Sequence, residues 1–384
     1  MVIKDPHRVS REITVQEARE ISDRYNTSLM VVDQKQRLIG IVTHRDLIFE
    51  KPDTKILAIM TKGKDLITAP PNTAIKRAQR ILHRNRIEKL PLVNKDGTLA
   101  GLITVKDILK RTEFPDATKD SEGRLRVGAA IGVRDDYFER AEMLIDAEVD
   151  VIVVDIAHGH SDMAIAAVKG LKKRFPEVEV ITGNIATPSG VKDLQKAGAD
   201  AVKVGVGPGS VCTTRVVAGT GFPQLSAILK CARAAKVPLI ADGGIRYPGD
   251  VTKALAAGAQ TVMIGNLFAG TNESPGAVVT RNGKRFKLYR GMAGYGASLS
   301  RKGPRGRGEE DQLLIDSMTP EGVDALVPYR GSAAEAIRNI VGGVRSGMSY
   351  SGAQTIAQLQ EKAKFVRVTL AGIRESHSHD VAEL

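Results

Sequence analysis

The chain has 384 residues, of which 26% are charged and 4% aromatic, and its formal net charge is +12. That length suits two or three domains of about 100–200 residues each. Binding of single-stranded nucleic acid relies on clustered aromatic side chains, so the scarce aromatics argue against nucleic acid as the primary partner. The positive charge instead suits anionic small molecules.

Cysteine content and the start of the chain indicate the cellular compartment. Two cysteines, Cys212 and Cys231, are too few for the disulfide framework of a small secreted domain. The amino-terminal MVIKDPHRVS is charged and lacks the apolar segment of a signal peptide. No apolar run approaches the roughly 20 residues that span a bilayer. We therefore expect a cytoplasmic protein with no membrane partner.

An internal repeat occupies the first part of the chain, where LIGIVTHRDL at 38–47 returns as LAGLITVKDI at 99–108. Each copy predicts a helix, a strand, a turn, a second strand and a helix that begins after a threonine. In a Thr-x-x-Asp step, both side chains can satisfy the free amide groups of a helix N-terminus. The two steps consist of Thr43 with Asp46 and of Thr104 with Asp107.

The repeated pair resembles a CBS tandem, also called a Bateman module. The resemblance implies an α+β domain over residues 1–111, with repeats at about 1–50 and 56–111, and a linker at 112–124. It also implies that the threonine and aspartate of each turn contact the ribose and phosphate of an adenine or guanine nucleotide. Since many such pairs bind nothing, plain helix capping remains the alternative role of these residues.

From residue 125 to 384, short β-branched runs alternate with amphipathic stretches. Continuous apolar runs are typical of parallel strands buried on both faces. This α/β alternation predicts a TIM-type (β/α)8 barrel with its active site at the carboxyl ends of the strands. Only six runs are found, so we expect a fragment that lacks the first strands of the barrel. The runs are LRVGAAIGV, VDVIVVDIAHG, VEVITGNIAT, ADAVKVGVGPG, VPLIADGGI and QTVMIGNLFAG.

The segment VGVGPGSVCTTR at residues 204–215 carries the strongest chemical pattern and follows a predicted strand. Its glycines let backbone groups face a ligand, and Ser210 can donate to a phosphate. Backbone dipoles or a nearby cation can deprotonate a thiol on such a loop, which makes Cys212 a candidate nucleophile. Cys231 lies in the helical segment LSAILKCARAA and is predicted to be a buried apolar side chain.

Resemblance to the IMP dehydrogenase/GMP reductase family covers essentially the whole chain and is carried by GPGSVCTTR, GTGFPQLSAI, ADGGIRYPGDVTKAL, MIGNLFAGTNESPG and YRGM. It implies that Cys212 attacks purine C2 and that Thr214 orients the water or ammonia that resolves the adduct. It also implies a nicotinamide-cofactor site, NAD in the dehydrogenase branch, at Asp155, Asn184, Gly205 and Gly207. The nucleotide, IMP in that branch, would contact Ser210, Asp242, Gly244, Gly265, Asn266, Tyr289, Gly291, Met292 and Glu321. Strand-end capping is the structural alternative for Asp155 and Asn184.

The resemblance further implies a potassium ion held by the carbonyl groups of Gly207, Gly209 and Cys212. Potassium prefers carbonyl oxygens, so a glycine-rich turn is chemically suitable. A neighbouring subunit would contribute the tail residues Glu375, Ser376 and His377, and the resemblance implies a homotetramer. Two histidines, His377 and His379, without further close ligands make a weak transition-metal site.

A flap at about 293–320 distinguishes the branches of the family. The dehydrogenase branch normally carries an Arg-Tyr dipeptide here, whose arginine is the base. This segment contains no Arg-Tyr dipeptide. That absence favours GMP reductase, which uses NADPH to convert GMP to IMP and ammonia. TNESPG, YRGM, TPEGVDALVPYRG and RESHSHDV favour the NAD-dependent oxidation of IMP to XMP, which is our prediction. A nucleotide-sensing paralogue with impaired catalysis is the third alternative.

Overall fold

A computed structural model describes residues 2–121, 123–134, 136–294, 297, 319–378 and 381. Most of the predicted flap at 293–320 therefore lies outside the described residues, and so does His379. The chain divides into two compact units, Met1–Arg126 and Val127–Leu384. Within the described part, no helix combines the length and apolar character needed to cross a membrane.

The first unit contains two copies of one supersecondary structure. Both copies run helix, strand, turn, strand, helix, which confirms the prediction from the repeat. The first copy comprises α1 (Val15–Tyr25), β2 (Leu29–Val32), β3 (Leu38–Val42) and α2 (His44–Leu47). The second comprises α4 (Ile75–Asn85), β5 (Lys89–Val93), β6 (Leu99–Thr104) and α5 (Val105–Glu113).

Short elements complete this unit, namely β1 (Arg8–Ser10), α3 (Ile56–Ile59), β4 (Thr61–Lys62) and a 3-10 turn at Gly63–Asp65. One sheet has the order β1-β2-β3-β4, and β5 pairs with β6 in an antiparallel hairpin. A shared apolar cluster joins the two copies, because Met30, Val32 and Ile41 of the first pack with Leu99 and Leu102 of the second. The two repeats therefore form one folded unit.

Threonine caps the last helix of both copies, as the Thr-x-x-Asp spacing predicts. The backbone amide and the hydroxyl of Thr43 each donate to Asp46 Oδ2 over 2.8 Å. In the second copy, Thr104 Oγ1 donates to Asp107 Oδ2 over 2.6 Å and accepts from the Asp107 amide over 3.1 Å. Asp46 in the first copy and Thr104 in the second therefore each accept from a backbone amide at the helix start, while Thr43 and Asp107 take part through the hydroxyl–carboxylate bond.

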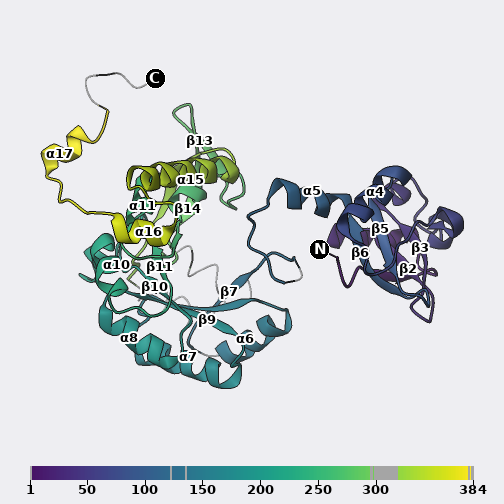
Figure 1. Ribbon diagram of the computed structural model, residues 1–384, viewed down its shortest axis with the longest axis horizontal. Coiled ribbons are helices and arrows are strands. Elements are labelled where there is room, and N and C mark those ends of the chain that lie inside the picture. The colour runs from purple at the N-terminus through teal and green to yellow at the C-terminus, as the bar shows by residue number, and fades with distance from the viewer. Residues whose placement is uncertain are drawn as a thin grey trace. The chain divides into compact units, whose positions relative to one another are not determined.

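A parallel sheet of six strands, ordered β12-β11-β10-β9-β8-β7, forms the centre of the second unit. Each of the six predicted runs supplies one strand, and the sheet curls like part of a barrel wall (Figure 1). Within the described residues, β7 and β12 are edge strands and do not pair with each other. The strands are β7 (Gly128–Ile131), β8 (Val151–Asp155), β9 (Glu179–Ile185), β10 (Ala201–Val204), β11 (Leu239–Asp242) and β12 (Thr261–Met263).

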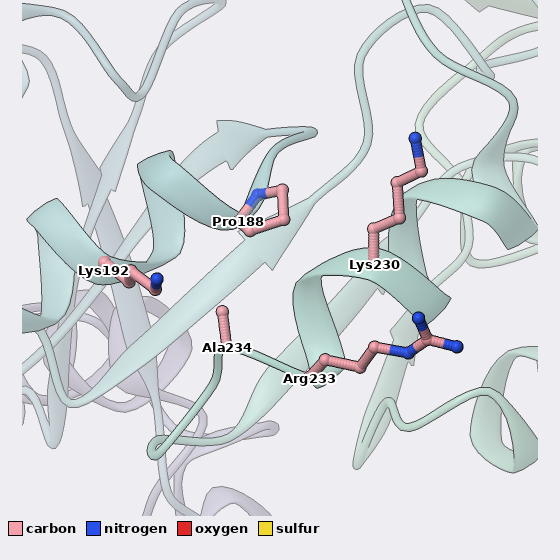
Figure 2. Close-up of a pocket in the computed structure, with 5 residues that line it drawn as sticks. All are labelled: Pro188, Lys192, Lys230, Arg233 and Ala234. Atoms are coloured by element: carbon pink, nitrogen blue, oxygen red, sulfur yellow. The ribbon is translucent and has the colours of Figure 1, made fainter.

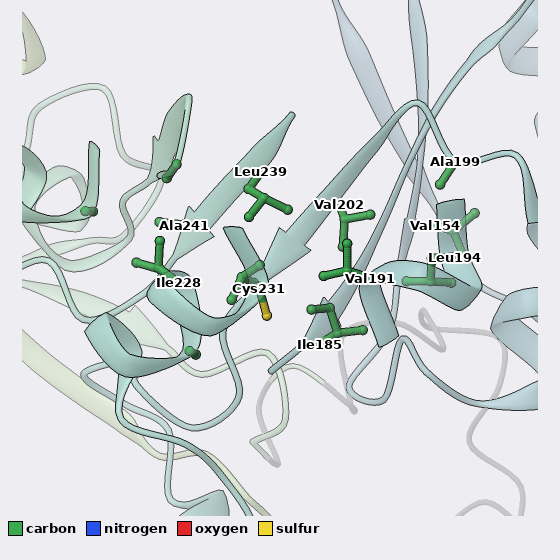
Figure 3. Packing of buried hydrophobic residues seen from close by; sticks show 14 of the residues in the cluster. Val154, Ile185, Val191, Leu194, Ala199, Val202, Ile228, Cys231, Leu239 and Ala241 are labelled. Atoms are coloured by element: carbon green, nitrogen blue, oxygen red, sulfur yellow. The ribbon is translucent and has the colours of Figure 1, made fainter. Parts of the chain in front are cut away.

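Helices follow the strands along the chain and cover the sheet. They are α6 (Tyr137–Asp146), α7 (Asp162–Arg174), α8 (Pro188–Ala197), α9 (Thr214–Val217), α10 (Gln224–Ala232), α11 (Pro248–Ala256) and α12 (Asn266–Ala269). Figure 3 shows Val191 and Leu194 of α8 and Ile228 of α10 packed over strand residues such as Val202. Cys231 also lies in this core with no exposed surface, and its burial raises the pKa of the thiol to about 11. Its predicted role as a buried apolar side chain is confirmed.

An antiparallel sheet follows the parallel one and was not predicted. It consists of β13 (Val278–Arg281), β14 (Lys284–Arg290) and β15 (Asp324–Pro328) in that order. The first two strands meet at Asn282-Gly283, where both φ angles are positive, at 50° and 72°. An Asn-Gly pair between apolar runs is a strong signal for such a hairpin, so the sequence did contain this information.

The chain ends in three helices, α15 (Ala333–Tyr350), α16 (Ile356–Lys362) and α17 (Leu370–Glu375). The side-chain amide of Gln360 on α16 donates to the carbonyls of Leu255 and Ala259 over 3.1 Å each, which fixes α16 against α11. In Figure 1, α17 lies apart from the parallel sheet.

Candidate active site at the carboxyl edge of the parallel sheet

The predicted site residues gather where the parallel strands end. Asp155 ends β8, Asp242 ends β11, and the loop with Cys212 follows β10. Gly265 and Asn266 follow β12, and Gly244 lies in the turn after β11. This is the edge at which barrels of alternating strands and helices place their active sites.

Cys212 is partly exposed on a loop that is held by a distant segment. Its Sγ donates to Thr214 Oγ1 over 3.2 Å. The amide of Thr213 donates to the Glu321 carbonyl over 2.8 Å, and the amide of Val323 donates to the Val211 carbonyl over 3.0 Å. The structure thus brings the predicted nucleophile, Thr214 and the backbone of Glu321 together, although Glu321 lies far along the chain.

A second group of predicted residues surrounds Ser210. The side-chain amide of Asn266 donates to Ser210 Oγ over 3.2 Å. A Cβ atom at Gly265 would lie 2.5 Å from the hydroxyl oxygen of Tyr289, so a larger residue would displace the phenol from its present position. Burial raises the pKa of Tyr289, a hydrogen bond with Ser210 opposes this shift, and the charge of Asp242 adds to it. These contacts bring Ser210, Gly265, Asn266 and Tyr289 together beside Asp242.

Asn184 occupies a bulge in β9, because the pairing with β10 shifts between Lys203–Gly183 and Val204–Ile185. Bulges commonly turn a side chain toward an active site. The Asn184 side-chain amide donates to Asp242 Oδ2 over 2.9 Å and to the Gly205 carbonyl over 2.7 Å. The predicted cofactor residues Asn184 and Gly205 therefore contact each other, and Asn184 also contacts Asp242, the residue predicted to bind the ribose.

Two residues that the sequence analysis passed over complete the site. Lys203, on β10, is 2% exposed and lies 2.6 Å from Asp242 Oδ2 and 3.0 Å from Asp155 Oδ1. Gln224 donates through Nε2 to the carbonyls of Val204 and Asp242, over 2.9 and 3.1 Å. The signal for Lys203 was a single charge inside the apolar strand ADAVKV.

Several other predicted residues lie near the Cys212 loop or on the surface. The amide of Gly291 donates to the Val323 carbonyl over 3.1 Å, which places Gly291 beside the segment that holds the Cys212 loop. Met292 is 70% exposed. The Gly209 carbonyl accepts from the Cys212 amide over 3.2 Å, and Gly207 lies in the same turn.

The predicted tail residues lie at the end of α17 and directly after it. Glu375 ends α17, and Ser376 donates through its hydroxyl to the Gly372 carbonyl over 2.7 Å. The ring of His377 lies 6.5 Å from the ring of Tyr247, measured between centroids. Helix α17 lies apart from the parallel sheet in Figure 1.

A surface pocket lies between α8 and α10, outside the group of site residues. Figure 2 shows three basic side chains at its walls, Lys192 on α8, Lys230 on α10 and Arg233 just beyond α10, with Pro188 and Ala234 completing the lining. None of the predicted site residues lines this pocket. Its basic lining contributes to the net positive charge of the chain.

Comparison with known proteins adds independent information. The sequence model of the IMP dehydrogenase / GMP reductase domain matches residues 12–379. The inosine-5'-monophosphate dehydrogenase of Nitrosopumilus maritimus is 50% identical over 385 aligned positions, which cover 99% of this chain and 80% of that protein. The enzyme of the same name from Aquifex aeolicus is 52% identical over 387 positions, covering 99% and 78%. A GMP reductase from Trypanosoma brucei, solved in complex with guanosine 5'-monophosphate, is similar with a TM-score of 0.89 and 43% identity, covering 100% of this chain and 80% of that one.

Proposed function

Because the chain belongs to the IMP dehydrogenase/GMP reductase family, we propose that it is an NAD-dependent IMP dehydrogenase, which oxidises IMP to XMP through a covalent bond to Cys212. Relatives with that activity in their names match 99% of the chain at about half identity. The observation that carries the proposal is the partly exposed thiol of Cys212, 3.2 Å from the Thr214 hydroxyl, on the loop that also presents Ser210.

The chemistry requires the thiol to act twice. The thiolate of Cys212 adds to C2 of the purine, and hydride leaves that carbon. Bound NAD+ supplies the acceptor for the hydride. Thr214 would then orient a water whose oxygen bonds to C2 while its proton passes to the solvent, and the thiolate departs to leave XMP. The separation of 3.2 Å between Sγ and Oγ1 suits a hydroxyl that serves the same carbon.

The substrate residues divide by the part of the nucleotide that they would bind. Ser210, Gly244, Gly265 and Asn266 would hold the 5′-phosphate through hydroxyl and amide donors. The carboxylate of Asp242 would accept hydrogen bonds from the two ribose hydroxyls, since one carboxylate can accept from a diol. Tyr289, Gly291 and Met292 would line the nucleotide site, and Glu321 would contact the purine edge. The contacts among Ser210, Asn266 and Tyr289 support a common phosphate-binding region.

The cofactor would lie on the side of Asp155, Asn184, Gly205 and Gly207. Asp155 is the most exposed acidic group of the site, with 46% of its side chain accessible, so it can still accept from a bound dinucleotide. Asn184 is fixed by its bonds to Asp242 and Gly205. The bond between Asn184 and Asp242 supports a cofactor site next to the ribose-binding carboxylate, as hydride transfer between two bound nucleotides demands.

Potassium and the assembly extend the proposal. Carbonyl groups of Gly207, Gly209 and Cys212 would bind the ion. The Gly209 carbonyl accepts one hydrogen bond, from the Cys212 amide, and its second lone pair would be available to the potassium ion. Glu375, Ser376 and His377 of a neighbouring subunit would complete the site, so the enzyme would be a homotetramer in the cytoplasm. The separation of α17 from the sheet within one chain supports a tail that acts on another subunit (Figure 1).

The two units suggest finer assignments of fold. The curled sheet would be part of a TIM-type barrel whose first strands are lacking, since β7 and β12 stay unpaired to each other in the described part of the chain. The first unit would be a tandem CBS module, since its two capped copies share one apolar cluster. An adenine or guanine nucleotide would then contact Thr43, Asp46, Thr104 and Asp107.

An assay of both family reactions tests the proposed activity. We expect NADH to form when the protein receives IMP and NAD+, as followed by its near-ultraviolet absorbance. Consumption of NADPH with GMP, and no NADH from IMP, would establish the reductase instead. The missing Arg-Tyr dipeptide and the similarity to a GMP reductase structure favour that second candidate. A protein with neither activity, but with nucleotide binding in its first unit, would be the sensing paralogue.

Nucleotide binding by the first unit is a separate prediction. Asp46→Asn combined with Asp107→Asn is expected to weaken ATP or GTP binding by about 10-fold or more, because a lost hydrogen bond to a bound ligand commonly costs that much. Titration calorimetry on the full chain measures the effect. Asp96→Asn is the matched control, since Asp96 accepts from Thr98 in the turn between β5 and β6. Equal affinity in all variants, or no binding by the parent, would leave capping as the role of these aspartates.

A further inference from the structure

Lys203 is a lysine in an unusual place, at the centre of the parallel sheet. It belongs to β10 and is among the largest side chains with almost no exposed surface, at 2%. In the sheet register, Lys203 lies opposite Gly183 on β9, and Gly183 lies opposite Asp155 on β8. The three residues form one row across three strands.

Gly183 makes the reach of Lys203 possible. A Cβ atom at position 183 would lie 2.7 Å from Lys203 Cβ and 2.6 Å from its carbonyl oxygen, so a larger residue cannot stand there. With no side chain in the middle of the row, the lysine ammonium extends over β9 to Asp155 Oδ1, 3.0 Å away. The same ammonium lies 2.6 Å from Asp242 Oδ2 on the other side.

The charges explain why this arrangement is stable. A buried ammonium is costly unless it is paired, and here it is paired with two carboxylates. Because Asp155 and Asp242 both contact one nitrogen, their carboxylates also lie close to each other. Without the lysine they would repel, and each would be drawn toward its neutral form or away from its present position.

Lys203 also determines how Asn184 is oriented. An ammonium can only donate, so the oxygen of the Asn184 amide must face Lys203, with which it forms a short hydrogen bond. The NH2 group is then turned toward Asp242 Oδ2 and the Gly205 carbonyl. Gly205 opens the loop that carries Cys212. One buried cation therefore sets the positions of both carboxylates and of the amide between them.

We propose that Lys203 is a positioning residue that couples the ribose-binding carboxylate of Asp242 to the cofactor-side carboxylate of Asp155 and so supports the binding of both nucleotides. This inference rests on the proposed function for the identity of the two ligands. It goes further by assigning one group that both sites share, although that group need not contact either ligand.

The test replaces Lys203 with methionine, an unbranched side chain that fills the space without charge. We expect the dissociation constant of IMP, measured by calorimetry without cofactor, and the KM for NAD+ each to rise by about 30-fold, as expected for a buried charge left without its partner. Lys203→Arg is expected to recover part of both losses, since a guanidinium also pairs with carboxylates. Lys172→Met is the control for the loss of an ion pair outside the site, because Lys172, which is 25% exposed, pairs with Asp200 over 3.0 Å.

A second substitution separates charge neutralisation from simple packing. Adding Asp155→Asn to Lys203→Met removes the repulsion that faces Asp242, so the double variant should bind IMP more tightly than Lys203→Met alone. Losses that merely add, or folded Lys203→Met protein with unchanged IMP and NAD+ binding, would overturn the proposal. If methionine lowers the yield of folded protein, Lys203→Gln carries the same comparison. A parent that consumes NADPH with GMP would refute the proposed function, while the same variants titrated with GMP would still test the coupling.

Discussion

Cys212→Ala is expected to reduce the turnover of IMP by about 10⁴-fold or more while IMP binding stays within a few-fold of the parent. The loss is large because the covalent route disappears with the sulfur, and the neighbouring Thr214 hydroxyl is a far weaker nucleophile than a thiolate. Binding should persist because the residues proposed to bind the phosphate and the ribose, including Ser210 and Asp242, are held in place by contacts that do not involve the sulfur. Steady-state NADH formation and calorimetry with IMP provide the two measurements.

Cys231 supplies the matched control. Its side chain has no exposed surface, and burial raises the pKa of the thiol to about 11, so it stays protonated and unreactive near neutral pH. Cys231→Ala should lower stability slightly and leave turnover intact. A thiol-alkylating reagent should inactivate the parent protein by modifying Cys212, and bound IMP should slow this inactivation. Turnover retained in Cys212→Ala would refute the assigned nucleophile.

The features that could be read from the sequence are those that neighbouring residues determine. All six parallel strands were recognisable because each is a short run rich in apolar residues, which is typical of strands in a parallel sheet. Thr43 and Thr104 were recognisable as caps because a cap and the amide that it serves lie within one helical turn. The same locality made the Cys212 loop visible as a reactive segment.

The connections between segments could not be read in this way. The carbonyl of Glu321 meets the amide of Thr213, and Lys203 meets Asp155 and Asp242, only because the sheet places separate strand ends side by side. Periodicity assigns residues to strands but does not give the register that aligns Lys203 with Gly183 and Asp155. A lysine in an apolar strand was therefore visible as an exception and had no partner until the fold was known.

Asp242→Asn is expected to lower kcat/KM for IMP by about 10²–10³-fold, because a site built to bind hydroxyl groups loses much when an acceptor is removed. The asparagine has the same size but keeps one acceptor oxygen, and its NH2 group would face a hydroxyl or the Lys203 ammonium. The backbone carbonyl of residue 242 would still accept from Gln224, so the strand end should keep its position. Asp200→Asn is the control, because Asp200 pairs with Lys172 before β10 begins and lies away from the strand ends that form the site.

Substrates that lack one ribose hydroxyl locate this loss at the ribose itself. The parent should use 2′-deoxy-IMP or 3′-deoxy-IMP far less efficiently than IMP, since either analogue leaves part of the Asp242 carboxylate unpaired. In Asp242→Asn that preference should largely disappear, because the group that detects the hydroxyls is already gone. If the variant instead kept the full preference of the parent for IMP, Asp242 would owe its effect to Lys203 and Asn184, and the ribose would have to be bound by another residue.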